Sequence, residues 1–187
     1  MADIVSSIAR SNNPGSQCKM IWVDETYINY LPDAVSLEPL CGSLPELVVC
    51  KSMSKCYALS GLRVAYAVSQ NMATLRRFIP PWAVSLPGQL AAVAALRNDA
   101  YYAQQYEVIH SERRKMQQAL DDLGFQVFSG VANYLLTYLP AASGYSSTRF
   151  IEACREQGLF VRDAQNMGVL LPNNACLLYT SPSPRDR

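Results

Sequence analysis

Short apolar runs alternate with helical patterns in the first half of the chain. Apolar runs at 20–23, 47–50 and 64–68 are each bounded by polar or glycine-containing segments, which is typical of buried strands, and they predict strands at 20–23, 47–51 and 64–69. Apolar residues then recur at helical spacing over 71–79 and 87–98. The second of these helical patterns is almost entirely apolar, so we expect that helix to be buried. Strands that alternate with helices favour an α/β fold with a parallel sheet.

The pattern changes in the second half. Periodic apolar residues over about 100–123 predict one long helix, and Gly124 is a suitable residue to end it. A smaller α+β unit follows, with its predicted strands and single helix at 126–128, 133–139, 146–157 and 159–162. We therefore expect four parts: 1–98, part of a large domain; 99–124, a connecting helix; 125–175, a small domain; and 176–187, a disordered tail.

Composition narrows the class of protein. Half of the 187 residues are hydrophobic and 17% are charged, so the chain can bury a core. The net charge is +1 and no basic stripe is present, which argues against nucleic acid and anionic membranes as partners. No apolar run approaches the roughly 18 residues that span a bilayer. The first ten residues lack the apolar segment of a signal peptide.

The cysteines predict neither a disulfide framework nor a metal site. No Cys-x-x-Cys pair and no metal-ligand spacing occurs among the six cysteines, at 18, 41, 50, 56, 154 and 176. Free thiols of this kind are usually core residues. A reduced, cytoplasmic setting is the simplest interpretation.

The segment after the second predicted strand carries a candidate reactive amine. Lys55 lies among small hydroxyl side chains, Ser52 and Ser54, and Arg63 follows it by eight residues. A lysine that is partly desolvated beside another cation has a lowered pKa, as a nucleophilic amine requires. Arg63 and the two serines could also bind a phosphate, because a guanidinium can contact two phosphate oxygens at once. A solvated loop lysine is the alternative.

Asp24 directly follows the first predicted strand, so it should lie at that strand's carboxyl end. Ligands of open α/β sheets bind outside these ends, where Lys55 should also lie. A carboxylate there could hold a protonated ring nitrogen, although an aspartate that caps a helix or forms a turn fits the spacing equally well. Tyr27 could direct its hydroxyl into the same crevice, or simply pack.

These motifs resemble those of a known family. Ser52-Met-Ser54-Lys55, with the Ala58-Leu-Ser-Gly-Leu-Arg63 segment after it, looks like the lysine signature of class I/II aminotransferases. These are pyridoxal-phosphate enzymes of the aspartate-aminotransferase fold. The segment 23–27 resembles the family's aspartate motif. Segments 131–135 and 158–163 are similar to small-domain segments of the histidinol-phosphate aminotransferase group, and the resemblance covers roughly residues 1–175.

The resemblance implies a partial pyridoxal-phosphate-dependent transferase fold and a role for each motif residue. Lys55 would bind the cofactor covalently and move a proton between it and the substrate. Asp24 would pair with the pyridine nitrogen, and Tyr27 would hydrogen-bond the ring hydroxyl. The protein in such enzymes supplies position and charge, while the cofactor supplies the organic chemistry.

The remaining implied roles concern the cofactor phosphate, the substrate and the partner. Ser52, Ser54 and Arg63 would hold the phosphate of pyridoxal 5'-phosphate. Arg162 matches an arginine near the distal phosphate or carboxylate of the substrate, and a surface arginine is the alternative. The substrates would be an amino acid or amino-alcohol phosphate and a 2-oxo acid. The family also implies a homodimer.

The chain departs from the family pattern at both ends. A glycine/serine turn, an aromatic residue and an asparagine that contact the cofactor in the family would all precede residue 1. An arginine for the substrate carboxylate would follow the Arg162 segment, where this chain continues into Cys176-Leu-Leu-Tyr and two Ser-Pro steps. We therefore expect a fragment of such an enzyme. Two alternatives stay open, a decarboxylase of the threonine-phosphate type and a truncated chain without activity.

Overall fold

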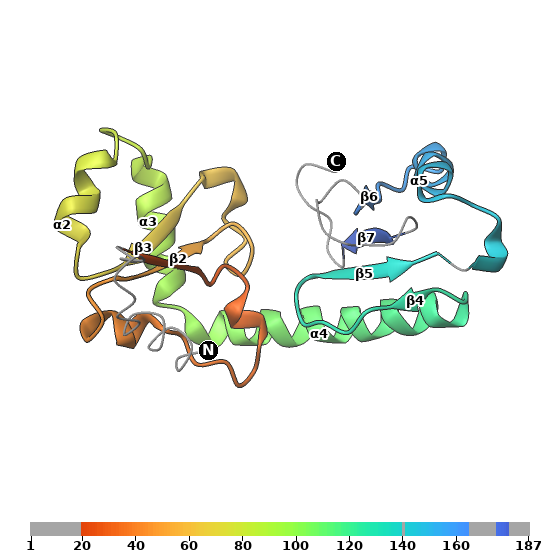
Figure 1. Ribbon diagram of the computed structural model, residues 1–187, viewed down its shortest axis with the longest axis horizontal. Coiled ribbons are helices and arrows are strands. Elements are labelled where there is room, and N and C mark those ends of the chain that lie inside the picture. Colours follow the sequence, from red (N-terminus) through yellow and green to blue (C-terminus); the bar gives the residue numbers. More distant parts are fainter. Residues whose placement is uncertain (1–19, 140, 165–174, 180–187) are drawn as a thin grey trace, which may run out of the picture. The chain divides into compact units, whose positions relative to one another are not determined.

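The computed structural model describes residues 20–139, 141–164 and 175–179 (Figure 1). The chain forms two compact units, Met1–Tyr102 and Ala103–Arg187. The boundary between the units falls inside the long helix α4 (Asp99–Asp122), which matches the helix predicted over about 100–123.

A three-stranded sheet organises the first unit. Its strands are β1 (Ile21–Asp24), β2 (Leu47–Ser52) and β3 (Ala65–Val68), in the order β1-β2-β3. β1 and β2 are parallel, as expected, and Asp24 pairs with Cys50. β3 runs antiparallel to β2, so the prediction of a parallel sheet is wrong for this strand. The connection 53–64 contains only a three-residue 3-10 turn, whereas a parallel crossover usually runs through an α-helix.

One face of this sheet packs on the segment that joins β1 to β2. That segment contains two short 3-10 helices, η1 (Ile28–Tyr30) and η2 (Glu38–Gly42). Leu47 and Val49 of β2 are fully buried against Leu37 and Cys41, and partly buried residues of β1 complete the cluster. Alternate residues of a strand point to opposite faces, so Trp22, between Ile21 and Val23, is left exposed on the other face.

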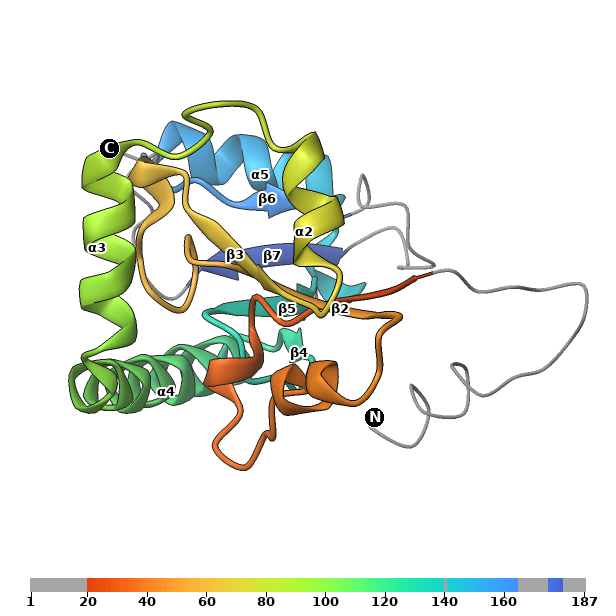
Figure 2. The same ribbon diagram turned by 90° about the vertical axis from the view of Figure 1, so that its left-hand side faces the viewer.

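Helices α2 (Met72–Leu75) and α3 (Leu86–Leu96) follow the sheet, with the 3-10 turn η4 (Arg76–Phe78) between them. Figure 2 shows α3 and the segment with η2 on different sides of the three strands. The close approach of α3 depends on Gly88, where a Cβ atom would lie 3.0 Å from Cγ2 of Val64 and 3.3 Å from the carbonyl oxygen of Leu62.

The prediction that α3 is buried is wrong for its large side chains. Its buried residues are the small ones, Gly88, Ala92 and Ala95. Leu90 and Val93 are 63% and 47% exposed. One face of a helix can pack on one sheet, so an all-apolar sequence leaves apolar side chains on the opposite face.

An antiparallel sheet forms the second unit, together with most of α4 and with α5 (Ser147–Glu156). Its strand order is β4-β5-β7-β6, where the strands are β4 (Gln126–Val127), β5 (Tyr134–Tyr138), β6 (Arg162–Asp163) and β7 (Ala175–Tyr179). Gly124 follows α4 with a φ of 82°, as expected of a helix-ending glycine. Leu139 and Ile151 form a small core against partly buried Phe125, Phe150 and Val161.

The start of the predicted tail is wrong. β7 continues to Tyr179 and pairs with β5 along its whole length and with β6 at two positions. A strand is stabilised by backbone pairing with neighbours distant in sequence, and the loss of a hydrophobic period at 176 does not prevent that pairing. Residues 180–187 lie outside the described part of the chain.

Arg113 connects α4 to the start of β5. Its guanidinium is buried, and Nη1 donates to the carbonyl oxygens of Ala132, at 3.2 Å, and of Tyr134. Burial lowers the pKa of this side chain, because the charged form loses solvation. Within the described ranges, no helix is both long and apolar enough to cross a bilayer.

A buried ion network lies beneath the end of β2. The Lys51 ammonium is 3.2 Å from Oε2 of Glu25 and 2.6 Å from Oε1 of Glu38. The side chains of Lys51 and Glu25 are only 8% and 2% exposed. Such a pair is stable only when additional hydrogen bonds satisfy its charged atoms.

Those additional bonds are present. Ser36 Oγ accepts from Lys51 Nζ at 3.2 Å and donates to Oε2 of Glu25 at 2.6 Å. The backbone amide of Leu37 donates to Oε1 of Glu25 at 2.7 Å. The Tyr66 hydroxyl donates to Oε1 of Glu38 at 2.9 Å. The network therefore ties β2, β3 and the 36–38 segment together.

We predict that Lys51→Met destabilises the chain by about 3–5 kcal/mol, because the substitution leaves a buried carboxylate without its cation. Urea unfolding measures this difference. Lys115→Met is the matched control, since Lys115 forms an exposed pair with Glu112 at 2.7 Å and its loss should cost at most about 1 kcal/mol. Equal effects of the two substitutions would contradict the structural importance of the network.

We also predict that the stabilisation by Lys51 is lost at alkaline pH. Burial by itself lowers the pKa of Lys51, but hydrogen bonds and charges from Glu38 and Glu25 raise it overall above its usual 10.5. A raised pKa in the folded state gives stability that is complete below the unfolded pKa and disappears as the pH rises through the folded one. The difference in unfolding free energy between the unsubstituted chain and Lys51→Met should stay constant from neutral pH to 10.5 and then shrink.

Candidate functional site

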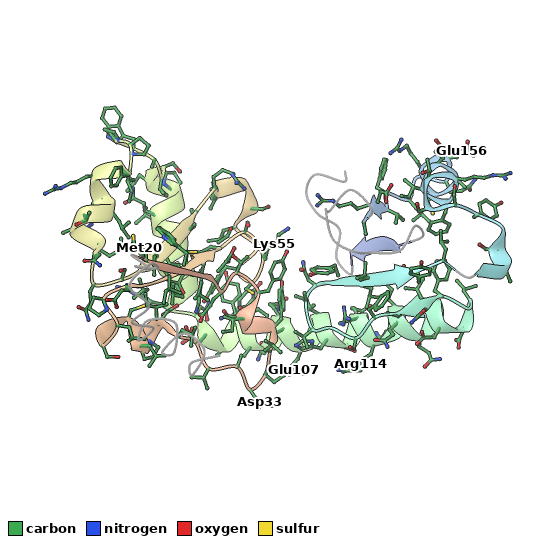
Figure 3. The ribbon with its side chains drawn as sticks, in the orientation of Figure 1. Met20, Asp33, Lys55, Glu107, Arg114 and Glu156 are labelled. Carbon is green, nitrogen blue, oxygen red and sulfur yellow. The ribbon has the colours of Figure 1, made fainter. Side chains whose placement is uncertain are left out.

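The carboxyl ends of β1 and β2 meet at one edge of the first unit's sheet. Asp24 is the last residue of β1 and Ser52 is the last residue of β2. Figure 3 labels Met20, which precedes β1, and Lys55, which follows β2, at opposite ends of this sheet. Because the two strands are parallel, the side chains that follow them lie at the same edge.

Thr26 joins these two strand ends. Its backbone amide and its hydroxyl both donate to Oδ1 of exposed Asp24, at 2.9 and 2.5 Å. The same hydroxyl oxygen accepts from the backbone amide of Ser52 at 3.0 Å. Asp24 therefore does form a turn, as one interpretation of its spacing predicted. Its second oxygen, Oδ2, receives no hydrogen bond from the residues that the structure describes.

Two hydroxyl groups lie next to this link. The Oγ atoms of Ser52 and Ser54 are 2.7 Å apart, and the amide of Ser54 lies 3.4 Å from Ser52 Oγ. Both side chains are partly buried. Hydroxyls and an amide gathered at a strand end can donate to the oxygens of an anion.

Lys55 lies in a turn whose neighbours are firmly held. Met53 before it is fully buried, and the Met53 amide donates to the carbonyl of Val64 at 3.0 Å. Cys56 after it is buried, and its thiol donates to the Thr26 carbonyl at 3.1 Å. Burial raises the pKa of Cys56 to about 11, so the thiol keeps its proton at neutral pH. Lys55 itself is half-buried.

Arg63 ends the same loop, after the 3-10 turn η3 (Ser60–Leu62). Its guanidinium is exposed, donates to the Ser60 carbonyl at 3.2 Å, and forms no ion pair with any described residue. Its backbone is left-handed, with φ 54°, and Ala58 has a φ of 55°. Non-glycine residues rarely adopt this region, and such strain clusters at functional sites.

The two other predicted residues are Tyr27 and Arg162. Tyr27 precedes η1, is partly buried, and has its ring 6.3 Å from that of buried Tyr30. Burial also raises the pKa of Tyr30. Arg162 belongs to the second unit, where it is exposed on β6. Its contact with a substrate stays a prediction.

Sequence reasoning missed Thr26 and the Lys51 network. A hydroxyl two residues after an aspartate is a known turn pattern, so the bond to Asp24 could have been inferred. The bond to Ser52 could not, because it depends on how β1 and β2 pair. Lys51 follows an apolar run that gives no sign of a buried charge.

A family model described as aminotransferase class I and II matches residues 16–177. The chain belongs to the class I and II aminotransferase family. The resemblance inferred from the lysine and aspartate motifs is thus confirmed.

The relatives of this chain include aromatic amino acid aminotransferases and histidinol-phosphate aminotransferases. The aromatic amino acid aminotransferase of Mycolicibacterium paratuberculosis is 33% identical over 155 residues, which cover 80% of this chain and 42% of that protein. The histidinol-phosphate aminotransferase of Acinetobacter baylyi is 30% identical over 156 residues, covering 81% and 41% respectively. The chain therefore spans about two-fifths of the length of these curated relatives.

Solved structures confirm the predicted fold class. Histidinol-phosphate aminotransferase from Sinorhizobium meliloti, solved in complex with pyridoxal-5'-phosphate, matches with a TM-score of 0.78 at 22% identity. That match covers 99% of this chain and 50% of that one. L-threonine-O-3-phosphate decarboxylase from Porphyromonas gingivalis matches with a TM-score of 0.73 at 22% identity, covering 88% and 51%. At these identities the likeness shows the fold, a partial aminotransferase fold.

We predict that Ala58→Gly stabilises the chain. Ala58 is exposed with a left-handed backbone, so glycine removes strain without losing packing, for a net gain of about 0.5–1 kcal/mol. Urea unfolding checks the sign. The control is Ala94→Gly, at an exposed position in the middle of α3, which should lower stability by about 0.5–1 kcal/mol. A loss of stability in both variants would show that Ala58 is not strained.

Proposed function

We propose that this chain carries the lysine-containing part of a pyridoxal-phosphate-dependent aminotransferase. The reaction would transfer an amino group between an amino acid, or an amino-alcohol phosphate resembling histidinol phosphate, and a 2-oxo acid. The observation that carries the proposal is the continuous hydrogen-bonded edge from Asp24 through Thr26 to Ser52 and Ser54, directly beside Lys55.

The residues at this edge fit pyridoxal 5'-phosphate chemically. Asp24 uses only Oδ1 within the described chain, so Oδ2 can accept from a protonated ring nitrogen. The hydroxyls of Ser52 and Ser54, with the guanidinium of Arg63, can donate to phosphate oxygens. Tyr27 is the candidate donor to the ring hydroxyl. When bound, the cofactor supplies an electron sink for the carbon that loses its proton.

Lys55 would hold the cofactor covalently through Nζ and move the proton at the reacting carbon. Its buried neighbours Met53 and Cys56 restrict the backbone from which this side chain projects. A general base held in place contributes about 10²–10⁴ in rate.

The remaining features of the function are also proposals. Both named groups of relatives act on amino acids or related amines, as their names state, and this supports an amino donor of that kind. We infer that Arg162 contacts the distal phosphate or carboxylate of the substrate. A homodimer in the cytoplasm, without nucleic-acid or membrane partners, is the assembly that we expect.

A decarboxylase of the threonine-phosphate type is the second candidate. The fold of the Porphyromonas gingivalis decarboxylase matches this chain almost as well as that of the Sinorhizobium meliloti aminotransferase. The edge described above would serve either reaction, because both need the same electron sink and the same lysine.

Titration with pyridoxal phosphate tests the proposed function. We predict a new visible absorbance band on addition of the cofactor to the 187-residue chain, and loss of the band in Lys55→Ala. Lys115→Ala, an exposed lysine of α4, should keep the band. A chain without the band, or a band that survives in Lys55→Ala, would overturn the proposal for this polypeptide.

The two candidate reactions are then separated by their products. The cofactor-loaded chain is incubated with histidinol phosphate and 2-oxoglutarate, and separately with threonine phosphate. Glutamate formation supports the aminotransferase, whereas release of CO₂ supports the decarboxylase. Lys55→Ala should lower either rate by at least about a hundredfold.

A further inference from the structure

The hydrogen bonds of Thr26 have only one possible direction. A backbone amide can only donate, so the Ser52 amide, 3.0 Å from Thr26 Oγ1, occupies an acceptor position of that hydroxyl. The hydroxyl proton is therefore left for Asp24, whose Oδ1 lies 2.5 Å away. Together with the Thr26 amide at 2.9 Å, this bond gives Oδ1 two donors from one residue.

The backbone carbonyl of Thr26 also accepts a hydrogen bond. The buried Cys56 thiol donates to the Thr26 carbonyl at 3.1 Å, and Cys56 is covalently next to Lys55. Thr26 therefore contacts one carboxylate, one strand end and the residue after the lysine.

This arrangement decides which oxygen of Asp24 is available. Two donors on Oδ1 fix the rotation of the carboxylate and leave Oδ2 as the oxygen that can meet a ligand. The same hydroxyl links that carboxylate to the backbone of Ser52, whose side chain is paired with Ser54.

We propose that Thr26 is a positioning residue. It sets the orientation of Asp24 toward the ring nitrogen of the cofactor and couples that orientation to the serine pair expected to bind the phosphate. The inference rests on the proposed function, since it assigns Asp24 to the ring nitrogen. Thr26 itself touches neither cofactor nor substrate in this proposal.

Three variants test it by titration with pyridoxal phosphate. Thr26→Val keeps the shape of the side chain and removes the hydroxyl, so the dissociation constant should rise by about tenfold. Thr26→Ser keeps the hydroxyl and should stay within about twofold. Thr74→Val makes the same change at an exposed position of α2 in the same unit and should change nothing. Equal affinity of Thr26→Val and the unsubstituted chain would overturn the proposal.

A cofactor analogue separates positioning from general damage to the fold. In 1-deazapyridoxal phosphate a carbon replaces the ring nitrogen, so Asp24 has no bond to lose. Thr26→Val should weaken binding of this analogue much less than binding of pyridoxal phosphate. Equal losses for both ligands would show that Thr26 does not act through the bond between Asp24 and the ring nitrogen, and would overturn the positioning role.

A measurement without cofactor keeps this inference separate from the proposed function. Hydrogen exchange at the Ser52 amide should be about tenfold faster in Thr26→Val than in Thr26→Ser, because that amide loses its acceptor. If the unsubstituted chain binds no pyridoxal phosphate, the proposed function fails for this polypeptide. The exchange rate still shows whether Thr26 accepts a hydrogen bond from the Ser52 amide. Unchanged exchange would show that Thr26 does not hold Ser52.

Discussion

The parallel pairing of β1 with β2 is the constraint on which the candidate site depends. The register that pairs Asp24 with Cys50 brings the carboxyl ends of both strands to one edge of the sheet. The hydroxyl of Thr26 can bridge Asp24 and the Ser52 amide only in that register. A slip of one residue would turn Ser52 to the opposite face and bring Lys51 or Met53 into its place.

The opposite face of the same strands is stabilised differently. Lys51 and Ser52 are neighbours on β2, so they point to opposite sides. Ser52 contributes to the hydrogen-bonded edge, while Lys51 enters the buried network with Glu25 and Glu38. Glu25 likewise directly follows Asp24. Asp24 and Ser52 thus lie at the candidate site, while their sequence neighbours Glu25 and Lys51 lie in the ion network on the opposite face. The backbone of both strands is therefore restricted from both sides.

The loop between β2 and β3 combines rigidity with strain. Buried Met53 and Cys56 anchor it, and left-handed backbone conformations occur at Ala58 in its middle and at Arg63 near its end. Strain of this kind persists only where the surroundings determine the backbone. A loop held in this way can present Lys55 and Arg63 from fixed positions, which is what binding an anionic cofactor beside an amine requires.

The sequence by itself determined the elements, the family and the candidate residues. Apolar runs and helical periods predict the positions of β1, β2, α3, α4 and α5 closely. The motifs around Lys55 and Asp24 are sufficient to identify the family. Both kinds of signal are local along the chain. Only the tertiary structure decided the antiparallel course of β3, the exposure of Leu90 and Val93, and the continuation of β7 past residue 176. It also decided that Thr26 joins Asp24 to Ser52 and that Lys51 is a buried cation. These features depend on contacts between segments far apart in sequence, whose pairing leaves no periodic signal in either segment alone.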